Sequence, residues 1–224
     1  MPNLRYNPGL GRRRVCGAGL LALALPGFAA HAAAPATGSA VPPGEVAGSV
    51  ASARLQGSGT LRFFGLLVYD ARLWVGAGFE PQTFEGHAFA LELQYARKFE
   101  GAEIAQRSIV EMRRTGSMTD SQAQAWQAAM TSAFPNVVAA DRLTGVHAPG
   151  GATRFFHNGR ATSAVPDPMF ARAFFGIWLA PTTSEPELRR RLIGPLPQGN
   201  AGPPQVSLTP TGGGLGAAWP WGRS

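Results

Sequence analysis

The sequence predicts an α+β domain in which an antiparallel sheet is covered by a layer of helices. Apolar residues recur at every second position before residue 100 and at helical spacing from there to residue 134. Strand-like and helix-like segments come in separate runs, in the order β-β-β-α-α-β-β-β-α-α, which favours an antiparallel sheet with helices packed on it. Between two strand-like segments, Asn158-Gly159 is the residue pair typical of a type I′ hairpin turn.

The first three strands are expected between residues 46 and 99. Residues 46–55 are small and apolar, and residues 61–75 form a long apolar and aromatic run. Gly57-Ser58-Gly59 lies between these runs and predicts the turn of a hairpin. A turn near Pro81 follows, and residues 88–99 alternate between apolar and polar positions. This period of two predicts a strand with one buried face, made of Phe89, Leu91, Leu93 and Tyr95.

Helical spacing begins after Glu100. Residues 101–114 place Ile104, Ile109 and Met112 among polar residues, which predicts an amphipathic helix. Thr119 and Gln122 have the spacing of a capping box for a second helix, which Pro135 ends. Three more strands are expected, at about 141–148, at 152–157 and after Asn158-Gly159.

The last two helices follow these strands. Residues 166–179 carry an apolar stripe that includes Phe170, Phe174 and Trp178. Ser184 and Glu187 again have the spacing of a capping box, and the short helix that they predict ends at Gly194.

The first residues are predicted to be a secretory signal and not part of the fold. Arg5 and Arg12-Arg13-Arg14 precede an apolar run that ends at Leu25, and Ala30-His31-Ala32 has the small residues of a cleavage site. The run is shorter than the ~20 residues that cross a bilayer. We expect cleavage near Ala32, a periplasmic or secreted product and no transmembrane span after processing. An uncleaved anchor that lies in the membrane interface is the alternative to cleavage. Export by the general route and export by the twin-arginine route both stay open.

The rest of the chain divides into three parts by composition. Residues 33–46 predict a flexible linker, residues 47–194 the folded domain, and residues 195–224 a disordered tail rich in Pro and Gly. Trp219 and Trp221 in the tail are either chance aromatics or a segment that docks on a partner or a membrane surface.

Charge and reactive residues exclude several function classes. Without the signal the chain has 16 basic and 13 acidic residues, a net charge of +3, which gives little reason to expect a nucleic-acid partner. The only cysteine, Cys16, lies in the signal. The three other histidines, His87, His147 and His157, share no metal-ligand spacing. The chain has no G-x-S-x-G motif and no phosphate loop, so we expect no metal and no cofactor.

Large aromatic residues are more numerous than a core of this size needs. The set is Phe63, Phe64, Tyr69, Trp74, Phe155, Phe156, Phe170, Phe174, Phe175 and Trp178. They either fill the core or line a cleft for a flat or long apolar ligand. Arg97 continues the face of Leu93 and Tyr95, where it is either a surface residue or a partner for a carboxylate or phenolate at the mouth of that cleft.

Three segments together resemble one known family. The first is LQGSGTLRFFGLLVYDARLWV, with Gly59, Arg62, Phe63, Phe64, Val68 and Tyr69. The second is LELQYARKFEGAEIAQRSIVEM, and the third runs from FFHNGR to Ile177-Trp178-Leu179 and the end at Gly194. In this order they resemble the bacterial, exported branch of the chalcone isomerase-like family over residues 50–194. The resemblance implies a large antiparallel sheet covered by helices, an open-faced β-sandwich with a cleft between its layers.

The resemblance also carries an expectation about activity. The family includes plant enzymes that close a flavanone ring and members that bind fatty acids. Phe64 stands where the plant enzymes have a strand threonine, and Arg54 is the nearest candidate for their upstream arginine. Their helical Tyr and Asn correspond to Ala105 and Met112, and a further Thr to Gly176. Because the donors that would stabilise a developing oxyanion are missing, we expect no efficient cyclisation of a chalcone.

The sequence therefore predicts an exported, non-catalytic domain that binds an apolar small molecule, such as a fatty acid, in a cleft between sheet and helices. The candidate binding residues are Arg54, Phe64, Tyr69, Tyr95, Arg97, Met112, Phe174 and Trp178. One alternative is an isomerase or intramolecular lyase on another substrate, using Arg54, Tyr69, Tyr95 or Arg97. Another is an interaction module that docks on an envelope protein through the tail.

Overall fold

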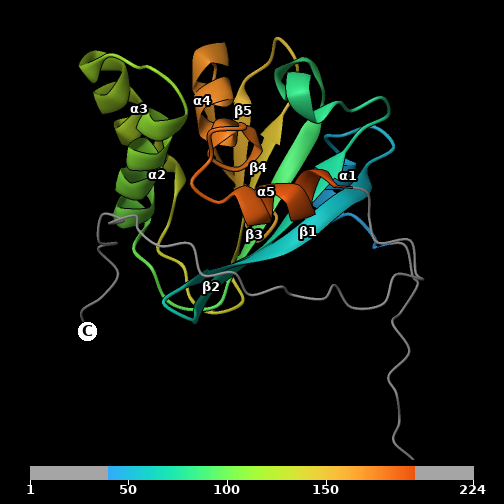
Figure 1. Cartoon of the computed structure of the whole chain (residues 1–224), viewed down its shortest axis with the longest axis horizontal. Helices are drawn as coiled ribbons and strands as arrows, with labels where there is room; N and C mark the ends of the chain where they lie inside the picture. The colour runs from blue at the N-terminus through green and yellow to red at the C-terminus, as the bar shows by residue number, and fades with distance from the viewer. Residues whose placement is uncertain (1–39, 195–224) are drawn as a thin grey trace, which may run out of the picture. The chain divides into compact units, whose positions relative to one another are not determined.

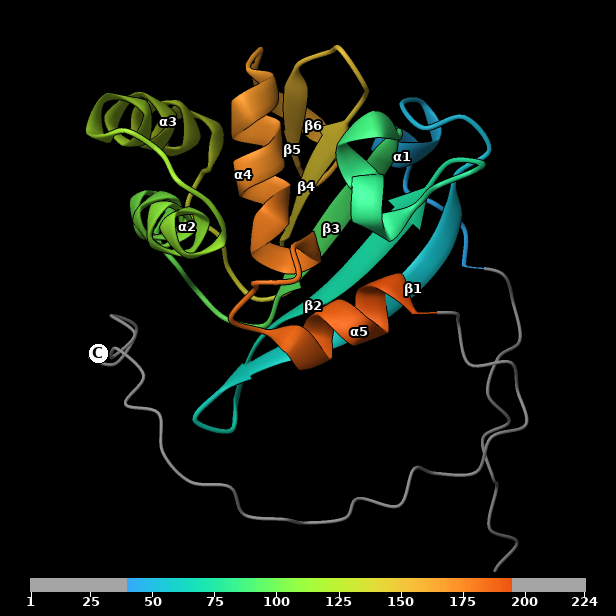
Figure 2. The ribbon, with the colours of Figure 1, turned by 45° about the horizontal axis from the view of Figure 1, so that its top comes forward.

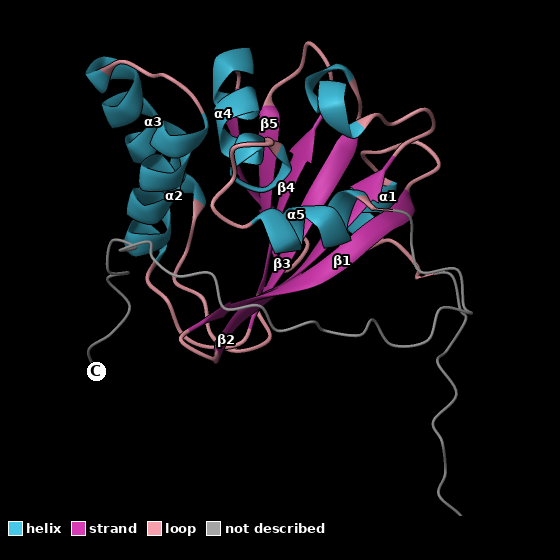
Figure 3. Ribbon diagram, viewed as in Figure 1, coloured by secondary structure: helices cyan, strands magenta, loops and turns pink. Residues whose placement is uncertain are grey.

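A computed structural model describes residues 40–194 (Figures 1 and 3). The strands are β1 (Arg54–Phe63), β2 (Leu66–Val75), β3 (Phe89–Tyr95), β4 (Arg142–His147), β5 (Thr153–His157) and β6 (Arg160–Val165). The helices are α1 (Gly44–Ala47), α2 (Gly101–Thr115), α3 (Asp120–Ala133), α4 (Pro168–Leu179), α5 (Pro186–Ile193) and the 3-10 helix η1 (Pro81–Gly86). No helix in this part of the chain is long and apolar enough to cross a membrane.

The six strands form one antiparallel sheet in which each strand pairs with the next along the chain. Helices α2 to α5 share one apolar core with one side of this sheet, which we call the front face (Figure 2). This arrangement confirms the predicted α+β class, and the element order agrees with the predicted one apart from the added α1 and η1.

The opposite side of the sheet, the back face, is covered by the first residues of the domain. Val46 and Val50 pack against a second apolar cluster that includes Trp74 and Phe156. Residues 44–47 therefore form a helix of the domain, although the sequence places most of them in the linker and expects a strand from residue 46. The domain begins earlier than predicted because it needs these residues to cover the back face.

Strand β3 is buried on both faces, whereas its alternation predicts one buried face. Glu92 on the back face is 1% exposed, and its carboxylate accepts hydrogen bonds from Arg72 Nη1 at 2.9 Å and Trp74 Nε1 at 2.8 Å. A buried carboxylate persists because charged and polar donors surround it. Glu92 of β3 therefore belongs to a buried network.

The first hairpin turns at Phe64-Gly65, so the predicted turn at Gly57–Gly59 is wrong. Both glycines lie inside β1, beneath α5. A Cβ on Gly57 would lie 2.5 Å from Leu192 O and closer still to Arg191 O. A glycine within a strand often marks such a close backbone approach. These glycines let α5 pack directly on the edge of the sheet.

Local turn and cap signals are confirmed in two places and wrong in a third. Thr119 and Gln122 form the predicted capping box of α3. Asn158 and Gly159 have φ values of +50° and +83°, as a type I′ turn requires. Ser184 does not cap α5, whose N-cap residue is Glu185; its hydroxyl donates to Glu111 on α2 instead.

Candidate functional site

A cleft with a cavity of about 80 Å³ lies between the front face and helices α2 and α4. Its walls are largely apolar and come from β1 to β5 as well as both helices. The apolar lining residues are Leu61, Val68, Leu91, Leu93, Phe99, Ile104, Phe134, Leu143, Gly145, Phe155, Phe174 and Ile177. The period-two alternation of the strands places their members of this set on one face of the sheet, opposite the apolar side of the helices.

Two tyrosines stand side by side on the floor of the cleft. Tyr69 of β2 pairs with Tyr95 of β3, and their ring centroids are 5.8 Å apart. Trp178 Nε1 of α4 donates a hydrogen bond to the Tyr69 hydroxyl at 3.0 Å. Burial raises the pKa of both phenols well above its ordinary value, so both hydroxyls stay protonated. The cleft therefore contains two neutral hydrogen-bond donors.

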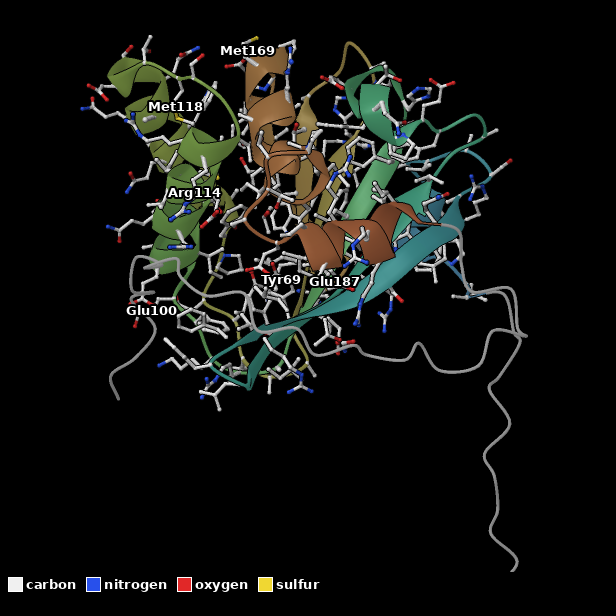
Figure 4. The ribbon with its side chains drawn as sticks, viewed as in Figure 1. Tyr69, Glu100, Arg114, Met118, Met169 and Glu187 are labelled. Atoms are coloured by element: carbon white, nitrogen blue, oxygen red, sulfur yellow. The ribbon has the colours of Figure 1, made fainter. Side chains whose placement is uncertain are left out.

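Helix α2 gives one wall of the cleft a charged rim. Arg107 and Glu111 form an ion pair one helical turn apart, and their side chains are only 11% and 6% exposed. Ser184 Oγ donates to Glu111 Oε2 at 2.8 Å, and Arg114 Nε lies 3.8 Å from the same oxygen. In Figure 4, Tyr69 lies between α2, which carries Arg114, and α5, which carries Glu187. The rim is therefore formed where α2 faces the segment before α5.

The burial of this rim shifts two of its ionisable groups. Desolvation lowers the pKa of Arg107, and the neighbouring Glu111 opposes that shift. Burial raises the pKa of Glu185, the Glu111 charge raises it further, and Arg107 opposes both. Glu111 and Glu185 thus both interact with the charge of Arg107, and the ionised form of Glu185 is disfavoured.

The structure brings together four of the eight predicted site residues. Tyr69, Tyr95, Phe174 and Trp178 all line the cleft. Met112 is fully buried in the core and is not among the residues that line the cavity.

The other three predicted residues lie away from the cleft. Arg54 is exposed at the start of β1, where its Nη1 donates to Gln56 Oε1 at 2.6 Å. Phe64 lies in the turn of the first hairpin and is 88% exposed. Arg97 is exposed because β3 ends at Tyr95, so the alternation does not extend to it.

Sequence reasoning missed Arg107, Ser108 and Glu111. A signal was present, because Ile104, Ser108 and Glu111 are spaced four and three residues apart and so share one face of the helix. Two polar residues in line with an isoleucine on a helix indicate a polar lining. Read without the fold, Arg107 and Glu111 look like an ordinary surface pair at i and i+4.

Within residues 40–194 no group of three or more His, Cys, Asp or Glu side chains could hold a metal ion. The polar groups of the cleft are phenol, indole, guanidinium, hydroxyl and carboxylate. These groups suit an organic ligand that is apolar over most of its surface and has one polar end.

Comparison with known proteins agrees with this geometry. Residues 38–194 match the sequence model of the family described as chalcone isomerase-like. A solved structure of a fatty-acid binding protein from Arabidopsis thaliana superposes with a TM-score of 0.51 at 14% identity, covering 70% of this chain and 96% of that one. At this identity the likeness concerns the fold. The sequence has no match among curated proteins.

Proposed function

The chain belongs to the chalcone isomerase-like family, and we propose that it is an exported protein that binds an apolar small molecule, such as a fatty acid, in the cleft. The observation that carries this proposal is the cavity between sheet and helices, whose walls are apolar except for one rim. A plant protein of the same fold is a fatty-acid binding protein, which supports the ligand class by analogy.

The rim supplies the groups that would place an acidic head. Among the described residues that line the cleft, Arg107 carries the only positive charge. A ligand carboxylate beside it would share the guanidinium with Glu111 and accept hydrogen bonds from the neutral tyrosines. The acyl chain would then lie along the apolar walls formed by β3 and α4.

The size of the cavity sets a condition on loading. An apolar cavity of about 150 Å³ holds benzene, whereas this one measures about 80 Å³. A fatty acid therefore enters only when side chains of the helix layer move away from the sheet. We expect shorter acyl chains to bind with less rearrangement than longer ones, and therefore more tightly per methylene.

Native mass spectrometry of the protein purified from its own cell envelope, with lipid extraction, is the first test. A stoichiometric acid or lipid that co-purifies supports the proposal and identifies the ligand class. The matched variants are Leu93→Trp, which fills the cleft, and Leu55→Trp, which adds the same bulk on the back face. The ligand should be lost in the first and kept in the second. If both variants retain it, the cleft is not its site.

An isomerase acting on another substrate is a second candidate. The convergence of Tyr69 and Tyr95 on one cleft favours it, because neutral phenols can donate hydrogen bonds to a developing enolate. Turnover that disappears in both Tyr→Phe variants while ligand affinity is kept would establish this candidate. Unchanged turnover in both would exclude a role for the phenols.

Export and tail docking concern residues outside the described part of the chain. We propose a periplasmic or secreted location because of the predicted signal at residues 1–32. An N-terminus near residue 33 on the protein recovered from cells would support it. The proposed docking of Trp219 and Trp221 on an envelope protein is tested by deleting residues 195–224 and measuring partner association.

A further inference from the structure

Exposed apolar side chains gather at one end of the sheet. Phe64 and Leu66, at the turn of the first hairpin, are 88% and 54% exposed, and Val138 is 55% exposed. The segment after β3 lies beside this hairpin, since Ala96 N donates to Val68 O at 3.0 Å. We define the hairpin-end surface as Arg62, Phe64, Leu66, Arg97, Lys98 and Val138.

Three loops build this surface together. Phe99 forms a β-bridge with Val137, which brings the loop before β4 next to the segment after β3. In Figure 1 the β1–β2 turn, the connection into α2 and the connection into β4 all come together at the lower end of the sheet. The loops that carry the exposed apolar residues thus lie at the same end of the sheet although they are far apart in sequence.

The geometry of the turn does not explain why residue 64 is a phenylalanine. Phe64 and Gly65 have φ values of +47° and +78°, nearly the same as Asn158 and Gly159 in the second hairpin. Asparagine adopts positive φ readily, whereas a bulky side chain is strained there. The chain therefore places an exposed phenylalanine at a position where folding favours asparagine. The backbone strain that this residue causes points to a role outside the fold.

The cations of the surface have no carboxylate partner. Arg62 donates to Gly65 O at 3.2 Å. Within residues 40–194 no salt bridge involves Arg62, Arg97 or Lys98, whereas Arg72, Arg113 and Arg142 each face a carboxylate. Glu100, at the start of α2, is the one acid in residues 96–100 (Figure 4). The surface therefore keeps an excess of positive charge that is available to a partner.

We propose that the hairpin-end surface docks on an anionic lipid bilayer. Phe64 and Leu66 would enter the boundary between headgroups and acyl chains, and the three cations would contact the headgroups. Aromatic and aliphatic side chains beside lysine and arginine are the combination that binds such interfaces. A protein partner would also bury apolar residues, but the unpaired cations favour a surface of diffuse negative charge.

Docking would bring the bilayer next to the cleft. The Phe64 ring contacts the Phe63 ring, with centroids 4.4 Å apart, and Phe63 packs on the apolar core. Leu61 and Val68, on either side of this hairpin, line the cavity. A ligand could therefore pass between bilayer and cleft along an apolar path. This last step rests on the proposed function, whereas docking itself does not.

The test is co-sedimentation of the chain from residue 33 onward with vesicles of phosphatidylcholine, with and without phosphatidylglycerol, at about 100 mM salt. This chain keeps all the strands and helices described above, which lie within residues 40–194. We expect binding to the anionic vesicles only. Phe64→Asn combined with Leu66→Ser should weaken it by about tenfold. Arg97→Glu combined with Lys98→Glu should weaken it about as much and remove its salt dependence.

Two variants at the opposite end of the sheet serve as controls. Met169, at the start of α4 (Figure 4), is 54% exposed, as Leu66 is, so Met169→Ser matches the apolar change. Arg54, at the start of β1, is exposed and forms no ion pair with another residue of the described part of the chain, so Arg54→Glu matches the charge change. Both controls should bind vesicles like the parent. Phe64→Asn alone should unfold at the same or a higher temperature, which separates lost docking from lost folding.

Several outcomes would overturn the proposal. They are no binding to anionic vesicles, equal binding to neutral vesicles, and an equal loss in the Met169→Ser control. A protein partner that is lost in the hairpin variants, with vesicles not bound, would also overturn it. Docking without transfer of a fluorescent fatty acid would leave the docking surface established and count against the proposed function.

Discussion

Removal of the Tyr69 hydroxyl tests whether the polar centre of the cleft holds the sheet and α4 together. In the parent protein this oxygen accepts the hydrogen bond of Trp178 Nε1 at 3.0 Å, and the two residues are 9% and 6% exposed. Tyr69→Phe leaves the indole donor buried without an acceptor. Such a loss costs about 1–3 kcal/mol of stability, so we expect about 2 kcal/mol here. For a domain of this size that corresponds to a melting temperature lower by about 4–8 °C.

Tyr95→Phe is the matched control for this change. Tyr95 is the cross-strand neighbour of Tyr69 and is similarly buried, but within residues 40–194 its hydroxyl has no hydrogen-bond partner. Its replacement should change the free energy of unfolding by less than about 0.5 kcal/mol. Urea unfolding at neutral pH measures all variants on one scale.

A double-mutant cycle with Trp178→Phe isolates the bond itself. Because Trp178→Phe removes the donor, the added cost of Tyr69→Phe in that background should be close to zero, giving a coupling of about 1–2 kcal/mol. Equal losses in Tyr69→Phe and Tyr95→Phe, or no coupling to Trp178, would refute the reasoning. In that case the phenol positions matter through packing alone.

Three further predictions follow from single features of the domain. Gly57→Ala should lower the free energy of unfolding by at least about 2 kcal/mol, because its Cβ would meet the backbone of α5. Gly44→Ala, which has nothing near its Cβ, should have little effect in the same urea titration. Glu185→Gln should be more stable than the parent at pH 7 and equally stable below pH 4.5. Burial raises the pKa of Glu185 in the folded state, so the contribution of this residue to stability is fully present below its ordinary pKa of 4.5 and is lost as the pH rises through the folded pKa. A gain in stability that persists at pH 4 would contradict this. The purified protein should not accelerate cyclisation of a chalcone above the buffer rate, since Phe64 lies in an exposed turn away from the cleft. Clear protein-dependent cyclisation in an absorbance assay would show that other groups do this chemistry.

Most of the strands and helices could be predicted because each of these follows from a local period or a local cap. The alternation at Phe89, Leu91 and Leu93 fixes the face that β3 turns to the helices, and this face carries much of the cleft. Tyr95 was found by the same reasoning. These positions depend only on which side chains share a face, which the sequence states directly.

The errors concern distances between segments far apart in the chain. Gly57 looks like a turn residue until α5, more than a hundred residues later, lies against it. Arg97 is an exception, because it was assigned to the face of Leu93 and Tyr95 by carrying the alternation two residues beyond the end of β3. The Arg107–Glu111 pair reads as solvent-exposed because burial of its face depends on α4 and on the segment before α5. A local pattern contains none of this long-range information.

Two features of the chain break a local rule without a gain for folding, and both bear on function. Ser108 and Glu111 place polar groups on the helix face that packs on the sheet, where apolar residues would give the more stable core. Phe64 places an aromatic ring in a left-handed, exposed turn whose counterpart in the second hairpin is Asn158. Natural sequences keep such conflicts mainly where an activity needs them. The first conflict lies inside the cleft and the second beside its apolar path to the surface. A protein that only had to fold would resolve both, so their presence at the two ends of one path favours a domain that takes up and releases an apolar ligand.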